Sequence, residues 1–312
     1  MSASRRVIRV TQPTPVGASG ESPLRLGRAP VLRRLLGDAG GLIGLAIITL
    51  FVIVAVLAPF LTAETPRQQD LSRRLAPPSW RAPLGFDELG RNEGVLIIWG
   101  SRTSLTIAVA SVLASVGAGV PLGLVGGFYR GVADDVIMRI VDVMLAFPGV
   151  LLALVVIAVL GSGLTSLILA VTVYSVPTYV RLVRAATLQI MPRQFIEAAR
   201  ATGAGSVRIM RLHVLPNILG PIIVQGSLSM GTVILTAGAM SFLGLGVQPP
   251  TVEWGAMIST GRLYVRNAPH AVVAPGLAIV LVVLGFNLLG DALRDTLDPT
   301  SRLVSASRKA GG

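Results

Sequence analysis

The sequence predicts an all-α polytopic membrane protein of about six transmembrane helices, and three observations support that fold class. The 312 residues are 52% hydrophobic and only 13% charged, whereas an average soluble domain carries about a quarter charged residues. The mean hydropathy is +0.73. Apolar runs recur at lengths near the roughly 20 residues that a helix needs to cross the hydrocarbon of a bilayer.

Six apolar runs are long enough to be spans, to within a few residues at each end. They are 40–61, 104–128, 139–160, 164–179, 215–243 and 271–289. The fourth run is short, and Pro216 and Pro221 break the start of the fifth, so five spans is the alternative count. The first run is too long for the apolar part of a signal peptide and is interpreted as an uncleaved anchor.

Arginine and lysine are divided unequally between the two sides of such a bundle. With six spans both termini share one side, which also holds the segments 130–139 and 181–211 and carries 19 of the 27 lysines and arginines. Cytoplasmic segments are enriched in these residues, so both termini are predicted to be cytoplasmic. The predicted organisation is a basic, partly disordered tail (1–39), an anchor (40–61), an extracytoplasmic segment (62–102), a five-helix core (103–290) with a cytoplasmic loop (183–214), and a cytoplasmic tail (291–312).

Composition excludes several kinds of chemistry on this chain. There are no cysteines, which rules out disulfides and thiol catalysis. His213 and His270 have no neighbours at ligand spacing, so no metal site is predicted. Lys309, the single lysine, is followed by Ala310 and cannot belong to a P-loop. No cofactor is therefore expected, and any ATP must be hydrolysed by another chain. The net charge of +12 is explained by cytoplasmic arginines, without nucleic acid.

The stretch EAARATGAGSVRIMRLHVLP (197–216) is a charged insert between two apolar runs. Residues 194–202 favour a helix, and Gly203 follows where helices commonly end in a left-handed residue. Ser206 can cap a second short helix. Glu197 lies four residues after Arg193 and three before Arg200, so it can pair with either.

Small residues in this insert allow another surface to approach closely. They are Ala198, Ala199, Ala201 and Gly203. On the residues alone two roles remain open: an amphipathic connector lying on anionic lipid, and a docking element for a partner protein.

The third run contains a further candidate, Asp142, because a carboxylate at membrane depth is a functional hypothesis. Arg139 lies three residues earlier on the same helical face, so one interpretation is a structural ion pair between them. A gating role or a contact with another domain is the alternative. Pro148 is predicted to kink this helix because proline deletes a backbone hydrogen bond.

Three other features have structural and functional interpretations. Asp291 and Arg294, with Asp295 and Asp298, follow the last run at helical spacing and form either a self-paired helix end or a partner contact. Trp254 is interpreted as an interfacial anchor, with a substrate contact as the alternative. The glycines of 119–127 predict close helix packing.

The spacing of Glu197-Ala198-Ala199, Gly203 and Leu215-Pro216 resembles the EAA loop of bacterial ATP-binding-cassette (ABC) importer permeases. HVLPN (213–217) is similar to the dipeptide, oligopeptide and nickel subfamily. Four other stretches resemble its second, C-type permease: PLGFDELGR (83–91), MRIVDVMLAFPGVLLAL (138–154), MSFLGLGVQPPTVEWGAMI (240–258) and FNLLGDALRDTLDP (286–299). The resemblance covers roughly 35–303. It fails after Arg91, where the family continues Asp-x-x-Ser-Arg and this chain has NEGVL (92–96).

The resemblance implies a type I ABC importer permease fold in the bacterial inner membrane and a non-catalytic transport subunit. The implied partners are a second homologous permease in a heterodimer, two cytoplasmic ATPases that hold ATP and Mg, an extracytoplasmic solute-binding protein, and membrane lipid. The residues implied in ATPase coupling are Glu197, Ala198, Ala199, Arg200, Gly203, Leu215 and Pro216.

Di- or oligopeptides are the implied cargo, with nickel complexes or glutathione-like substrates as alternatives. An ion-coupled secondary transporter is the competing class. Such transporters place ionisable groups near the midplane of the membrane, and the spans here have almost none.

Overall fold

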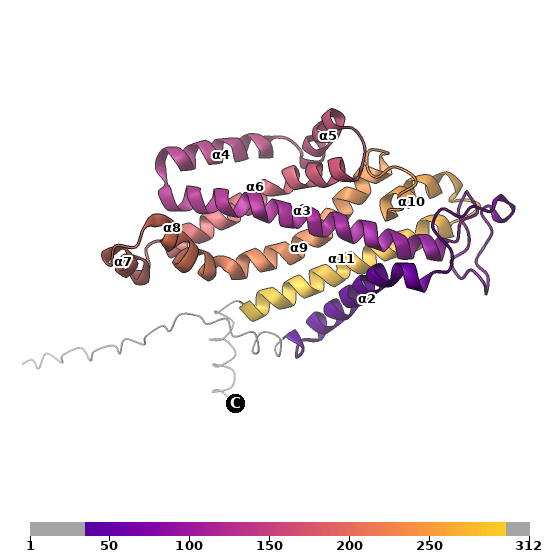
Figure 1. Cartoon of the computed structure of the whole chain (residues 1–312), viewed down its shortest axis with the longest axis horizontal. Helices are drawn as coiled ribbons and strands as arrows, with labels where there is room; N and C mark the ends of the chain where they lie inside the picture. Colours follow the sequence, from indigo (N-terminus) through magenta and orange to yellow (C-terminus); the bar gives the residue numbers. More distant parts are fainter. Residues whose placement is uncertain (1–34, 298–312) are drawn as a thin grey trace, which may run out of the picture.

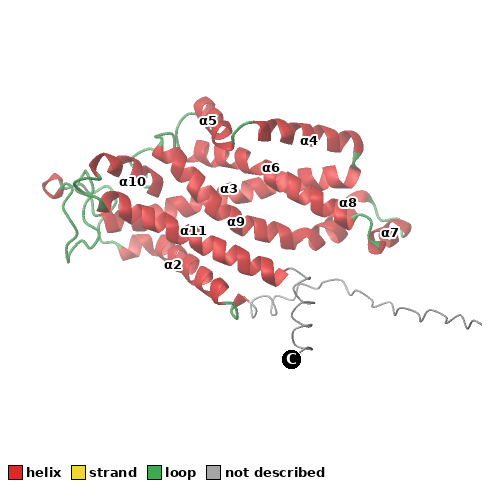
Figure 2. Cartoon of the chain, turned by 180° about the vertical axis from the view of Figure 1, so that it is seen from behind, coloured by secondary structure: helices red, strands yellow, loops and turns green. Residues whose placement is uncertain are grey.

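A computed structural model of the chain describes residues 35–297, and its regular structure is helical throughout that range (Figure 2). The helices, labelled in Figure 1, are α2 (Ala39–Leu61), α3 (Glu93–Tyr129), α4 (Gly131–Ala146), α5 (Gly149–Leu160), α6 (Leu164–Ile190), α7 (Gln194–Ala201), α8 (Ser206–Ile209), α9 (Leu215–Phe242), α10 (Trp254–Gly261) and α11 (His270–Leu297). A turn of π-helix, Met210–Val214, joins α8 to α9.

Five continuous helical segments in the described range are long and apolar enough to cross a membrane: α2, α3, α6, α8 to α9, and α11. A sixth crossing exists only if α4 and α5 form one span, although they meet at 94°. The fourth predicted span is not short, because α6 continues past residue 179 to Ile190. The tails 1–34 and 298–312 lie outside the described residues, and Asp298 with them.

The direction of α3 and α6 decides whether the bent pair crosses the bundle. Ser111 donates a hydrogen bond to the carbonyl of Ile168, and Ser115 to that of Thr172, so residue numbers rise together along the two helices. Helices α3 and α6 are therefore parallel, and the chain between them must return from one end of the bundle to the other. The α4–α5 pair makes that return, which supports six crossings.

Glycines bring α3 and α6 together over most of their length, as predicted for 119–127. A Cβ added at Gly123 would lie 2.7 Å from the carbonyl oxygen of Val180, and one at Gly127 would lie 2.7 Å from the Cβ of Thr187. Such distances leave no room for a side chain. The two helices pack with their backbones in close approach, as small residues allow in membranes.

The third predicted span is broken at Pro148, where a kink in one continuous helix was expected. Helix α4 ends before Phe147, and Pro148 is the N-cap of α5. A proline has no N–H to continue the helical hydrogen bonds. The next residue, Gly149, lies so close to the ring of Tyr174 that an added Cβ would overlap it. The prolyl ring and the missing side chain together allow the 94° turn.

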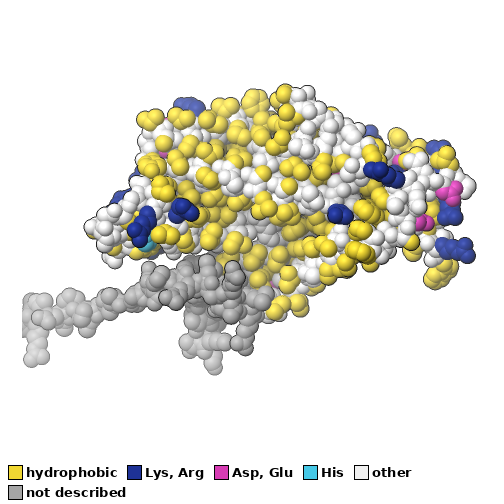
Figure 3. All heavy atoms as spheres, viewed as in Figure 1, with side chains coloured by type: hydrophobic (Ala, Val, Ile, Leu, Met, Phe, Trp, Pro, Cys, Tyr) yellow, Lys and Arg dark blue, Asp and Glu magenta, His cyan; other side chains and the backbone are white. Residues whose placement is uncertain are grey.

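The two ends of the bundle carry different structures. Residues 62–92 and α10 lie at one end, and α7 and α8 project from the other (Figure 1). Hydrophobic side chains cover the visible middle of the molecule, while arginine and acidic side chains gather toward the ends (Figure 3). We call the end with 62–92 and α10 the loop end, and the end with α7 and α8 the elbow end.

Candidate functional site

The candidate site is the α7–α8 element, residues 194–209, at the elbow end. Helix α7 ends in a glycine turn: Gly203 has φ +77°, its N–H donates to the carbonyl of Arg200, and the N–H of Ala204 donates to that of Ala199. These two bonds form a Schellman motif, which satisfies carbonyls at a helix end and favours glycine at the left-handed position. The predicted helix and glycine elbow are confirmed.

Two residues anchor α7 to the bundle. Ile196 is completely buried and Ala199 nearly so. They pack in one apolar cluster with residues of α3, α6, α8, α9 and the π-turn, among them Val120, Leu124, Val183, Ile209, Val214 and Ile218. A displacement of α7 therefore acts on three of the long helices at once.

The exposed face of α7 carries most of the residues that the sequence pointed to. Glu197, Ala198, Arg200 and Gly203 are exposed. Ala199 is the exception, because it faces the apolar cluster and contributes to anchoring. In the described part of the chain no ion pair joins Glu197 to Arg200, whose guanidinium lies instead over the ring of Phe128, 5.8 Å from its centroid.

A hollow of about 540 Å³ lies between α7 and the segment that follows the elbow. Its walls are mainly small residues, with two cationic or ionisable side chains on one side: Phe195, Ala198, Ala199, Thr202, Gly203, Ala204, Arg208 and His213. This arrangement suits the insertion of a partner's side chain. His213 thus lies beside the candidate surface.

The return from the elbow into the next span differs from the prediction. Ser206 is not a cap, because the N-cap of α8 is Gly205, which has no side chain to accept a hydrogen bond. Nor is α8 separate, since it continues through the π-turn into α9, where Leu215 and Pro216 form the first turn. The elbow is therefore joined directly to a transmembrane helix.

Asp142 pairs with Arg181, and the predicted pair with Arg139 is wrong. Nη2 of Arg181 lies 2.6 Å from Oδ1 of Asp142, and both side chains are about half exposed. The cause is tertiary: α4 lies against α6, so a residue 39 positions away replaces the one three positions away. Arg139 is exposed.

A second pair between the same helices was missed from the sequence. Arg184 donates two hydrogen bonds to Asp134, through Nε at 2.5 Å and Nη2 at 2.6 Å. The sequence does contain a pattern that indicates both pairs: two arginines lie three residues apart on α6, and two aspartates lie eight residues apart on α4. These pairs connect α4 to the helix that leads into α7.

Asp291 and Arg294 lie exposed on the last turns of α11, which extends to Leu297. Among the described residues no ion pair joins the two side chains. Their predicted role as a partner contact stays a prediction.

At the loop end, PLGFDELGR forms a turn around Asp87. Its Oδ1 accepts hydrogen bonds from the N–H groups of Leu89 and Arg91, and its Oδ2 accepts one from Nε of Arg91. The next residues, where the family resemblance fails, begin α3 with Asn92 as the N-cap, whose side chain accepts a hydrogen bond from the N–H of Gly94.

Trp254 is fully buried, so its interpretation as an interfacial anchor is wrong. Its indole N–H donates to the carbonyl of Ile97, and its ring packs edge-on against Phe51. The preceding residue, Glu253, caps α10 by accepting hydrogen bonds from the N–H groups of Gly255 and Ala256. Both residues hold α10 against α3.

Comparisons with known proteins agree with this architecture. Residues 119–303 match the family described as the binding-protein-dependent transport system inner membrane component, and residues 29–78 match the N-terminal transmembrane domain of oligopeptide transport permease C. A di/tripeptide transport system permease protein of Pseudomonas aeruginosa is 46% identical over 84% of this chain and 88% of its own length.

A glutathione transport system permease protein of Pectobacterium atrosepticum is 42% identical over 95% of this chain and 97% of its own. Among solved structures, the inward-facing MetNI methionine ABC transporter aligns with a TM-score of 0.55 at 22% identity, over 65% of this chain and 96% of the other. That likeness shows the fold. With the family match over more than half its length, the chain belongs to the inner membrane components of binding-protein-dependent transport systems, the multi-pass permeases of ABC importers.

Proposed function

We propose that this chain is a permease subunit of an importer for di- or oligopeptides, and that the α7–α8 element couples it to the ATPases. The observation that carries the coupling role is the geometry of α7, which is anchored by two buried residues while its other face and the adjoining hollow are open. The relatives named for di/tripeptide and glutathione transport support peptide-like cargo.

The assembly that this role requires is larger than one chain. A second homologous permease would complete a heterodimer around the translocation path, and two cytoplasmic ATPases would bind ATP and Mg and dock on the elbow end. A solute-binding protein would deliver cargo to the loop end. On this proposal the chain performs no bond chemistry, and both its termini lie in the cytoplasm with the α7–α8 element.

The proposed mechanism transfers movement from the ATPases to the spans. When the ATPases close, they displace α7, and the apolar cluster around Ile196 passes that displacement to α3, α6 and α9. ATP binding must stabilise docking to one state of the permease more than to the other, because equal affinity would shift no population. Residues Leu215 and Pro216, at the start of α9, lie where the movement enters the span.

The test is the substitution Gly203→Asp in the complete importer reconstituted in vesicles. No atom lies within 4 Å of a Cβ added at Gly203, and aspartate tolerates the left-handed conformation better than most residues. The variant should therefore insert and fold, while a charged side chain enters the docking surface. We expect peptide uptake to be abolished.

Gly131→Asp is the matched control. Gly131 also has a positive φ, +57°, and no atom within 4 Å of an added Cβ, but it is the first residue of α4, outside the α7–α8 element. It should retain uptake. Wild-type uptake by the Gly203→Asp importer would contradict coupling through this element, and uptake in vesicles without the ATPases would favour an ion-driven transporter.

The relatives support two cargo classes, peptides and glutathione-like compounds. The affinities of the cognate solute-binding protein for dipeptides and for glutathione would decide between them. Selective binding of glutathione would move the assignment to the second class without changing the coupling role.

A further inference from the structure

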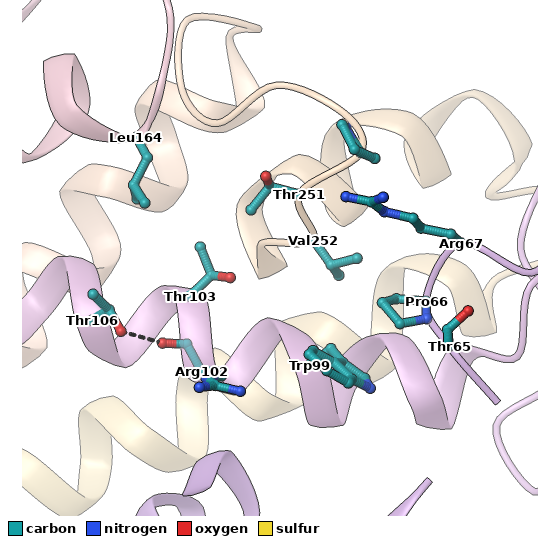
Figure 4. A pocket seen from close by; sticks show the side chains of 11 residues that line it. Thr65, Pro66, Arg67, Trp99, Arg102, Thr103, Thr106, Leu164, Thr251 and Val252 are labelled. Carbon is teal, nitrogen blue, oxygen red and sulfur yellow. Dashed lines mark hydrogen bonds between the residues drawn. The ribbon is translucent and has the colours of Figure 1, made fainter. Parts of the chain in front are cut away.

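A cavity of about 610 Å³ opens at the loop end of the bundle, opposite the α7–α8 element. It is bounded by the start of the 62–92 segment, by α3, by the first residue of α6 and by the loop before α10 (Figure 4). Its volume is within the range of about 300–1,000 Å³ that is usual for small-molecule sites. The four walls come from distant parts of the sequence, so the cavity exists only in the folded chain.

The charge of this cavity is positive. Arg67 and Arg102 both line it, and no acidic residue does. In Figure 4 Arg67 reaches from the 62–92 segment toward the loop that holds Thr251, and Arg102 lies with Trp99 on the α3 side. Two other arginines of this end are paired with carboxylates, Arg73 with Asp70 and Arg91 with Asp87. No ion pair in the described range involves Arg67 or Arg102, so both guanidinium groups can bind an anion.

Neutral groups in the cavity suit the rest of a peptide. The hydroxyls of Thr103 and Thr251 have no hydrogen-bond partner within the described residues, and hydroxyls both donate and accept. Trp99 provides an aromatic wall, and its indole N–H donates to Thr62 Oγ1 at 3.0 Å, which fixes the ring. An aromatic face accepts side chains of many shapes, which fits a path for varied peptides.

From this geometry we infer that the cavity receives peptides as they leave the solute-binding protein, with Arg67 and Arg102 binding the C-terminal carboxylate. Guanidinium groups match carboxylates through paired N–H donors. The threonine hydroxyls contact the peptide amides, and the side chains lie against Trp99. The inference rests on the proposed function and adds to it the part of the substrate that this chain recognises.

The experiment compares Arg67→Gln and Arg102→Gln with wild type in the complete importer in vesicles, at peptide concentrations below saturation. Each variant loses a charge-assisted hydrogen bond to the carboxylate, so we expect it to take up an unmodified dipeptide about tenfold more slowly, which corresponds to about 1.4 kcal/mol. The matched control is Arg266→Gln, because Arg266 is an exposed arginine of the same end that does not line the cavity. It should transport normally.

A second substrate tests whether the defect depends on the C-terminal carboxylate of the peptide. The same dipeptide with a C-terminal amide has no anion to bind, so the ratio of wild-type to variant uptake should fall to about one. Because each ratio uses the same binding protein and the same substrate, the preferences of the binding protein cancel. Equal losses for acid and amide would overturn the inference.

Two other anions could occupy the cavity, and each predicts a different outcome. If the headgroup of an anionic lipid binds there, the defect should disappear in vesicles made only of the zwitterionic lipid phosphatidylcholine. If an acidic surface of the binding protein binds there, the variants should bind the liganded binding protein more weakly. Either result would overturn the inference. Failure of the wild-type importer to take up peptides would overturn the proposed function as well, whereas normal uptake by both variants would overturn the inference alone.

Discussion

The loop end and the elbow end of this bundle are built in opposite ways. At the loop end, acidic side chains close turns and cap a helix: Asp87 holds the turn before α3, and Glu253 holds the start of α10, beside the buried Trp254. At the elbow end, α7 is attached through Ile196 and Ala199 and presents its remaining surface outward.

This difference separates motifs that build the structure from motifs that present a surface. PLGFDELGR and the stretch around Trp254 resemble a family as strongly as the EAA loop does, yet their side chains are used internally. Most residues of α7 are instead exposed. Substitutions of the buried residues in these loop-end motifs should therefore change stability, and substitutions on the exposed face of α7 should change coupling.

The largest effect on stability is expected from Trp254→Ala. Removing a fully buried aromatic side chain and its hydrogen bond to Ile97 should lower the free energy of unfolding by about 3–5 kcal/mol. Phe195→Ala, on the half-exposed face of α7, should cost about 1 kcal/mol or less. Denaturant unfolding of the purified chain in detergent measures both. Equal losses of unfolding free energy in the two variants would contradict the proposed difference between the loop end and the elbow end.

An intermediate effect is expected at the ion pairs between α4 and α6. Asp134→Asn removes the negative charge and one of the two oxygens that accept short, partly shielded hydrogen bonds from Arg184, and it should cost about 1.5–3 kcal/mol. Asp142→Asn breaks a half-exposed pair with Arg181 and should cost no more than about 1 kcal/mol. The same unfolding assay ranks them. The reverse order would contradict the ranking of the two pairs by their exposure.

The smallest effect is a pH dependence at Glu253. Burial raises the pKa of this carboxyl, against the opposing effect of the N–H groups of Gly255 and Ala256. The folded chain therefore binds the proton more tightly than the unfolded chain. This contribution to stability is fully present below the unfolded pKa of about 4.3 and is lost as pH rises through the folded value. In Glu253→Gln the temperature of thermal unfolding should depend less on pH over this range than in the wild type. An equal pH dependence in the two proteins would contradict the prediction.

Local patterns allowed much of the elbow end to be predicted. The helix of 194–202, the left-handed Gly203 and the close packing of 119–127 all follow from residues near one another in sequence. The apolar runs marked the spans well. Hydropathy carries no information on direction, however, so the 94° turn at Pro148 was expected only as a kink.

What the sequence could not supply were partners brought together by tertiary packing. Arg181 competes with Arg139 for Asp142 only once α6 lies beside α4. Trp254 is buried because α3 offers it the carbonyl of Ile97 and the bare backbone of Gly100. Arg67 and Thr251 both line the cavity at the loop end, and no local spacing in the sequence indicates that they come together there.

Glycines of α3 hold α3 and α6 in close contact along most of their length, so the two helices are expected to move together as one long unit. Helix α3 has 37 residues, which corresponds to about 55 Å, so a tilt of about 5° displaces its far end by about 5 Å. At the elbow end of this helix pair α6 leads into α7, and at the loop end α3 carries Trp99 and Arg102. On the proposed mechanism, a slight tilt of this helix pair at the elbow end would therefore be sufficient to change the shape of the cavity at the loop end.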